Sequence, residues 1–208
     1  MCYSERVSAF TFLAVTGVCV YLWRRAVGLD KPIALILFLV VLMQAIEWVL
    51  WRNTRCNTMN KLMSAIIPIY LTLQPIIANA IVGYYDAGWA GGYTTLAGIL
   101  SLALPYKVHQ AVKEYGVCST VSPAGHLIWP RPILPDDSVT GSIGRLLYYA
   151  SFVYPLVTLK NTTFSALYVG FAVLSLGMSG YKEKGSWPSL WCHFVNALAA
   201  FAVLRPGV

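Results

Sequence analysis

The amino-acid sequence predicts an all-α fold, a polytopic bundle of transmembrane helices in a single domain that covers residues 1–208. Hydrophobic residues make up 58% of the chain and charged residues only 11%, whereas a soluble domain carries roughly a quarter charged residues. A soluble fold of this length could not bury so much apolar surface. The sequence therefore predicts an integral, multi-pass membrane protein whose main partner is the lipid bilayer.

Six apolar runs approach or exceed the roughly 17–25 residues that a helix needs to cross the hydrocarbon core. A seventh, 139–159, reaches that length only if Arg145 extends its side chain to the headgroups, so six helices result if 146–159 does not span. The first run lacks a small-residue cleavage pattern, and we interpret it as a helix rather than a signal peptide. The predicted helices are 7–23, 32–51, 62–85, 87–106, 139–159, 161–181 and 185–204.

Residues 107–138 form the longest stretch outside the predicted helices. After a short amphipathic segment, 107–114, glycines and prolines prevent a long helix from continuing beyond Tyr115. The string 127–129 is apolar and aromatic, which is unusual for a solvated linker. These residues are therefore expected to form a folded extramembrane cap, and the alternative is a flexible connector.

The basic residues predict which end of the bundle faces the cytoplasm. With seven crossings, the amino terminus shares one end, here called side A, with the loops at 52–61, 107–145 and 182–184, and the other end is side B. Side A carries ten of the 15 basic residues: Arg6, Arg52, Arg55, Lys61, Lys107, Lys113, Arg131, Arg145, Lys182 and Lys184. The positive-inside rule thus predicts a cytoplasmic amino terminus. The first helix gives a contrary local signal, because one basic residue precedes it and three follow: Arg6, then Arg24, Arg25 and Lys31.

The net charge of +7 does not indicate a nucleic-acid partner, because the basic residues flank apolar runs instead of forming one patch. A homo-oligomer is compatible with the sequence. No cofactor is predicted. The last predicted helix has no lysine that could hold retinal, and only one histidine lies in a predicted span, which argues against a hydrolase that needs several helical histidines.

Polar side chains inside the predicted helices are the first candidate site. Gln44 and Glu47 lie three residues apart near the side A end of one helix, and His193 and Asn196 have the same spacing near the side A end of the last. An ionisable residue at membrane depth is a functional-site hypothesis by default. We predict that Glu47 pairs with His193 to relay protons or hold a cation. The alternative is that Glu47 reaches the interface or bonds a neighbouring helix.

The predicted helix 62–85 contains Pro68 and Pro75, with Gln74 and Asn79 beside and beyond the second proline. Broken helices of this kind line sites in transporters, so these two amides are further candidates for a pathway. Prolines are also frequent in ordinary transmembrane helices, and this simpler interpretation is favoured.

Cysteine and histidine side chains gather at side A, where the cap also carries His126 and Trp129. The four cysteines at this end are Cys2, Cys56, Cys118 and Cys192. If side A faces an oxidising space, two disulfides could connect the amino terminus, the 52–61 loop, the cap and the last helix. If side A is cytosolic, the thiols stay reduced and either bind a metal with a histidine or serve only as packing. Because no CxxC spacing is present, the metal alternative has little support.

Four short strings occur in order along the chain: Met1-Cys2-Tyr3-Ser4, Glu47-Trp48, Gly125-His126-Leu127 with Trp129, and Ser189-Leu190-Trp191-Cys192. In this order they resemble an uncharacterised family of small, roughly seven-helix membrane proteins found in large DNA viruses of algae and protists and in some of their hosts. The resemblance implies the helical topology and the importance of the side A rim. It implies no activity.

Three functions fit these observations. The leading hypothesis is a channel or transporter for protons, small cations or a small solute, gated by the cap. The second is a membrane-embedded enzyme with a Cys/His site, which is the less favoured class. The third is a structural or assembly protein of a viral or organelle membrane, with the cap as the docking surface.

Overall fold

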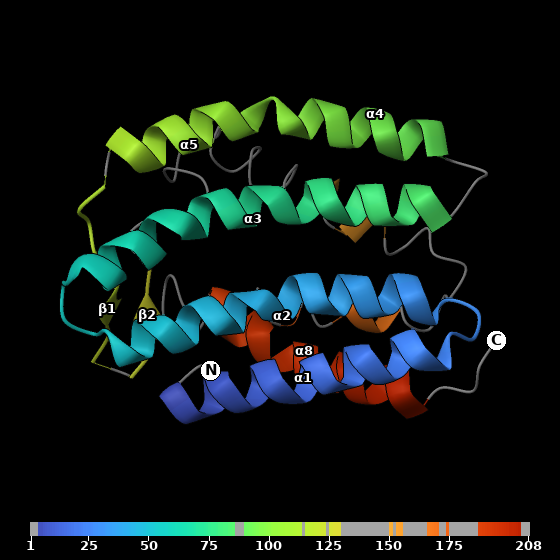
Figure 1. Cartoon of the computed structure of the whole chain (residues 1–208), viewed down its shortest axis with the longest axis horizontal. Coiled ribbons are helices and arrows are strands. Elements are labelled where there is room, and N and C mark those ends of the chain that lie inside the picture. The colour runs from blue at the N-terminus through green and yellow to red at the C-terminus, as the bar shows by residue number, and fades with distance from the viewer. Residues whose placement is uncertain are drawn as a thin grey trace.

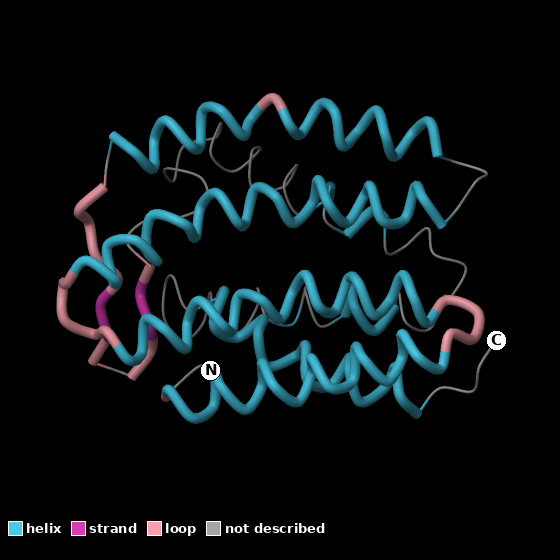
Figure 2. Tube along the Cα trace, viewed as in Figure 1, coloured by secondary structure: helices cyan, strands magenta, loops and turns pink. Residues whose placement is uncertain are grey.

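The structure is a computed structural model, and it describes residues 4–85, 90–113, 115–123, 125–129, 150–151, 153–155, 166–170, 174 and 187–204. Long helices run lengthwise beside one another, and the described connections lie mainly at the two ends of the bundle (Figures 1 and 2). The helices are α1 Glu5–Arg25, α2 Asp30–Arg52, α3 Thr58–Tyr85, α4 Ala90–Ser101, α5 Ala103–Lys113 and α8 Trp187–Leu204. The strands are β1 Thr120–Val121 and β2 Leu127–Ile128.

Within the described residues, α1, α2 and α3 are long and apolar enough to cross a membrane. These helices contain the predicted spans 7–23, 32–51 and 62–85. The predicted helical fold is therefore confirmed, with three helices that could span a membrane, whereas the count of seven helices stays a prediction. Most of the predicted helices 139–159 and 161–181 lies outside the described residues, as does most of the cap beyond Trp129.

Polar side chains extend the first and third helices beyond their apolar runs. The Ser4 hydroxyl accepts a hydrogen bond from the backbone N–H of Val7 at 3.3 Å and begins α1. The Asn57 side chain does the same for α3, accepting from the backbone N–H of Asn60 at 2.9 Å. Both are favoured capping residues, because the first backbone N–H groups of a helix have no partner within it.

The predicted single span 87–106 with a separate amphipathic segment 107–114 is wrong in detail, because the structure forms two helices in line, α4 and α5. Together they run along α3, with the break at Leu102 (Figures 1 and 2). Pro105 explains the break: it has no N–H for the carbonyl of Ser101, and its ring would clash with that carbonyl in a continuous helix. Leu102 N–H instead bonds the carbonyl of Ile99 at 3.1 Å.

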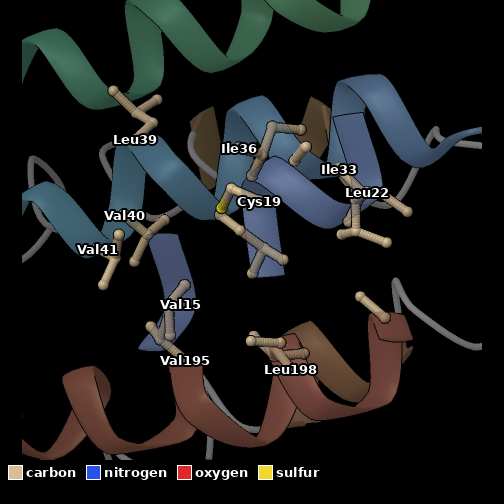
Figure 3. Packing of buried hydrophobic residues seen from close by; sticks show 14 of the residues in the cluster. Val15, Cys19, Leu22, Ile33, Ile36, Leu39, Val40, Val41, Val195 and Leu198 are labelled. Carbon is tan, nitrogen blue, oxygen red and sulfur yellow. The ribbon is translucent and has the colours of Figure 1, made fainter. Parts of the chain in front are cut away.

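The core surrounds α2, which is buried along most of its length between α1, α3 and α8. Figure 3 shows Val15 of α1 facing Val195 of α8, with Val40 of α2 close by. Lipid tails are as apolar as these side chains, so burial here contributes through close packing more than through exclusion of water. Small or branched apolar residues at the contact let the helices approach one another.

Candidate functional site

The buried carboxylate on α2 is the principal candidate site. Glu47 and Gln44 are 0% and 1% exposed, and Gln44 Nε2 donates a hydrogen bond to Glu47 Oε2 at 2.9 Å. Glu47 lies five residues before the end of α2 at Arg52, which places it about 7–8 Å inside that end. A carboxylate at this depth needs hydrogen-bond donors, because burial disfavours an unpaired polar group. Gln44 supplies one such donor.

The predicted partner of Glu47 is His193, which belongs to α8. The side chain of His193 lies outside the described part of the chain, so this pair stays a prediction. The backbone of α8 is described, and the carboxyl end of that helix contacts Arg25 at side B. Helix α8 therefore begins toward side A, at the end of the bundle that holds Glu47.

The other predicted pathway residues bond neighbouring segments instead of meeting Glu47. Asn196 donates to Thr11 Oγ1 of α1 at 3.1 Å, and Gln74 donates to the carbonyl of Leu39 in α2 at 3.4 Å. Such interhelical hydrogen bonds contribute on the order of 0.6 kcal/mol each in measured membrane proteins. Their geometry indicates a role in helix assembly, and their part in a pathway stays a prediction.

Polar side chains of α3 donate hydrogen bonds to the carbonyls of its two prolines. Asn79 Nδ2 donates to the carbonyl of Pro75 at 2.8 Å and to the carbonyl of Ser151 at 2.9 Å. Thr72 Oγ1 donates to the carbonyl of Pro68 at 2.8 Å. Each proline carbonyl thus receives a side-chain donor from the residue four positions later, although the carbonyls that lose a helical N–H partner are those of Ser64 and Leu71, four residues before each proline. Helix α3 nevertheless continues through both positions, which fits the simpler interpretation of the two prolines.

Residues 115–129 fold back onto the side A ends of α2 and α3. Strands β1 and β2 pair antiparallel, with Val121 opposite Leu127, and the turn between them contains Gly125 at φ +79°. Leu127 belongs to a buried cluster with Leu50 and Ile67, and Trp129 packs against this cluster. Met43 and Leu50, which flank the Gln44–Glu47 pair in sequence, belong to the same cluster. The described part of the predicted cap therefore covers the turns of α2 that carry the candidate site.

A disulfide attaches this hairpin to the loop between α2 and α3, and an amide clamp attaches it to the first turn of α3. Cys56 and Cys118 form a disulfide with a Cα–Cα distance of 5.5 Å. One residue further, Ser119 N–H donates to Asn60 Oδ1 at 2.9 Å, and Asn60 Nδ2 donates back to the Ser119 carbonyl at 3.1 Å. The Ser64 hydroxyl joins the same buried group at 2.8 Å from the Ser119 hydroxyl. The Asn60 side chain thus pairs with Ser119 as a neighbouring β-strand would.

The side A cysteines were expected either to form disulfides or to stay reduced. The structure describes one pair of them, Cys56 and Cys118. Cys56 and Cys118 are joined, so these two sulfurs are not available as metal ligands. Cys2 and the side chain of Cys192 lie outside the described residues. Where the structure describes the chain, no group of three or more Cys, His, Asp and Glu side chains is placed to hold a metal ion. His126 lies at the hairpin turn and is partly buried, with its N–H bonded to Ser122 Oγ at 3.1 Å.

Side B contains an ionic clamp that the sequence did not predict. Arg25 forms two hydrogen bonds with the carboxylate of Asp30, Nε to Oδ2 at 2.6 Å and a terminal nitrogen to Oδ1 at 2.7 Å. Its two terminal nitrogens also donate to the carbonyls of Val203 and Ala202 at 3.0 and 3.1 Å, at the carboxyl end of α8. Those carbonyls lack partners within the helix, and a cation favours that end of the helix dipole. One side chain therefore joins α1, α2 and α8.

Comparisons with protein-family models, with curated proteins and with solved structures found no match to this chain. The described part of the chain is mostly helical and contains three helices that could span a membrane.

Proposed function

We propose that the chain is a seven-helix membrane protein that passes protons or another small cation through a site formed by Glu47 and Gln44. The observation that carries the proposal is a fully buried carboxylate inside a helix that is long and apolar enough to span a membrane. Such residues are rare in spans and commonly mark ion or proton pathways. The cap residues Leu127 and Trp129 lie over the same end of α2 and would control access from side A.

The direction of α8 supports the count of seven. The chain reaches side A at the hairpin, and α8 begins toward side A and ends at side B beside Arg25. An even number of crossings between the hairpin and α8 fits this direction, and the predicted helices 139–159 and 161–181 would supply two. A six-helix chain would bring the end of α8 to side A, away from Arg25. The cytoplasmic placement of the amino terminus rests here on the charge count alone.

Flux through proteoliposomes tests the proposal. In the wild type, an imposed pH gradient is expected to drive proton flux, and Glu47→Gln is expected to lower that flux at least about tenfold, because the neutral amide cannot exchange a proton or balance a cation. Glu5→Gln is the matched control. Glu5 is also a carboxylate at the side A end, but it is solvent-exposed and paired with Arg52, so its loss should leave the flux unchanged. Absence of wild-type flux under gradients of protons, sodium and potassium would contradict the proposal.

A second candidate, an assembly component of a membrane, is favoured by the double attachment of the hairpin. A segment held by both a disulfide and a buried amide clamp presents a rigid surface, as a docking site requires. The resemblance to a family from large DNA viruses fits this alternative. Purification of a stable complex that is lost on deletion of the hairpin, together with absence of flux, would favour it over conduction.

A further inference from the structure

The disulfide between Cys56 and Cys118 indicates which end of the bundle faces the cytosol. Cys56 is exposed and Cys118 partly so, and both lie at side A outside the predicted spans. Disulfides at exposed positions form and persist in oxidising compartments and are rare in the cytosol. Forming the bond converts two thiols into one S–S bond and passes two electrons and two protons to a disulfide-donating oxidoreductase, an enzyme class of such compartments.

The basic residues that flank α1 independently indicate that side B faces the cytosol. Only Arg6 lies at its side A end, whereas three basic residues follow it at side B: Arg24, Arg25 and Lys31. The charge around the first helix commonly dominates the orientation of a multi-pass protein. Lys31 Nζ lies 5.7 Å from the centre of the Trp23 ring, and Arg24 is exposed beside it. This basic and aromatic rim has the composition of an anchor on the cytosolic face.

The total charge count gives the opposite signal. Lys107 and Lys113 belong to helix α5, and Lys113 lies in its last turn, at side A. At the ends of α1, α2 and α3 the described basic residues are nearly balanced, four at side A and three at side B: Arg6, Arg52, Arg55 and Lys61, against Arg24, Arg25 and Lys31. With Lys107 and Lys113 of α5 included, six basic residues lie toward side A and three toward side B, and we give this count less weight than the disulfide and the residues around α1.

We infer that side A, with the disulfide-bonded hairpin, faces an oxidising, extracytosolic compartment, and that the rim of Trp23, Arg24 and Lys31 anchors side B at the cytosolic face. The amino end of α1 then lies outside the cytosol, opposite to the prediction from the total count. The inference is independent of conduction, because it concerns only the compartment and the orientation.

Thiol labelling of the full chain in bacterial spheroplasts tests the compartment. The assay uses Cys2→Ser and Cys192→Ser in the same chain, which leaves the disulfide pair and the buried Cys19. A membrane-impermeant maleimide–polyethylene glycol added outside is expected to label two thiols per chain, and only after an impermeant phosphine reductant. With Cys118→Ser added, Cys56 should be labelled once without reductant. Labelling only after permeabilisation, or labelling of the intact pair without reductant, would overturn the inference.

Charge variants test the anchor in the same assay. Arg24→Gln with Lys31→Gln should lower the fraction of chains labelled from outside by about two-fold or more, because it removes the basic residues that retain side B in the cytosol. The matched pair at side A, Arg55→Gln with Lys61→Gln, should leave that fraction unchanged or raise it. The reverse result, in which only the side A pair lowers the fraction, would contradict the assigned orientation.

Discussion

The two ends of the bundle are held together by different chemistry. At side A the hairpin is attached by the Cys56–Cys118 disulfide and by the Asn60 amide, whereas at side B the last helix is attached by the charged group of Arg25 with Asp30. The side A contacts attach a segment outside the helices, and the side B contact joins helices to each other. The comparison indicates that an ion pair with hydrogen bonds joins the helix ends at side B. At side A, a disulfide and amide hydrogen bonds hold the short hairpin in place.

Removing Asp30 should have the largest effect on stability. Asp30→Ala leaves the Arg25 guanidinium without its carboxylate, and breaking a buried pair from one side typically destabilises a protein by about 3–5 kcal/mol. Arg25 is partly exposed, so the lower end of that range is expected, measured as loss of folded protein in a detergent unfolding titration. Arg52→Gln breaks the exposed pair with Glu5 and should change stability by no more than about 0.5 kcal/mol. Equal effects of the two variants would show that side B is not held by this charge pair.

Removing the amide clamp at side A should have the next largest effect. Asn60→Ala deletes the side chain that bonds Ser119 in both directions and leaves buried backbone groups of the hairpin without their partner. The expected loss is about 2–3 kcal/mol, with faster proteolysis in the hairpin as a local measurement. Thr120→Ala, at an exposed position in the same hairpin, serves as the control and should change neither the stability nor the rate of proteolysis. Unchanged proteolysis in Asn60→Ala would mean that the disulfide alone holds the hairpin.

Removing the disulfide should have the smallest effect of the three. For a sequence separation of 62, the loss of loop-closure entropy in the unfolded chain would stabilise a soluble protein by about 4 kcal/mol. In a membrane, α3 and the α4–α5 pair already return the chain to side A, so less of that entropy remains to be removed. The double variant Cys56→Ser with Cys118→Ser should therefore lose less than Asn60→Ala does in the same titration. A larger loss would reverse the order proposed for side A.

The sequence was sufficient for the parts of the fold that depend on apolar length. Apolar runs correctly located α1, α2 and α3. The apolar run of α3 begins after Lys61, whereas the helix begins at Thr58, because the Asn57 side chain caps it. The break between α4 and α5 had a signal in Pro105, which the apolar composition around it obscured. Helix existence follows from composition, whereas helix ends depend on single polar side chains.

The candidate site was predictable in its residues and not in its contacts. Helical spacing placed Gln44 and Glu47 on one face of a helix, and the structure adds the hydrogen bond between them. The same reasoning could not find the partners of Asn60 and Arg25, which lie 59 and up to 178 residues away. Asn60 resembles an ordinary turn residue in the sequence. The spacing of Arg25 and Asp30 across a turn at Gly28 was the one available signal for the side B clamp.

The clamp at side B has a consequence for biosynthesis. Arg25 and Asp30 are made early, but the carbonyls of Ala202 and Val203, 177 and 178 residues after Arg25, are made much later. At 5–20 residues per second, the first helical pair would wait roughly 10–40 s for the helix that completes its bonds. During that interval the contact surface of α1 and α2 for α8 would stay unoccupied, and the insertion of α8 would complete the group that Arg25 began.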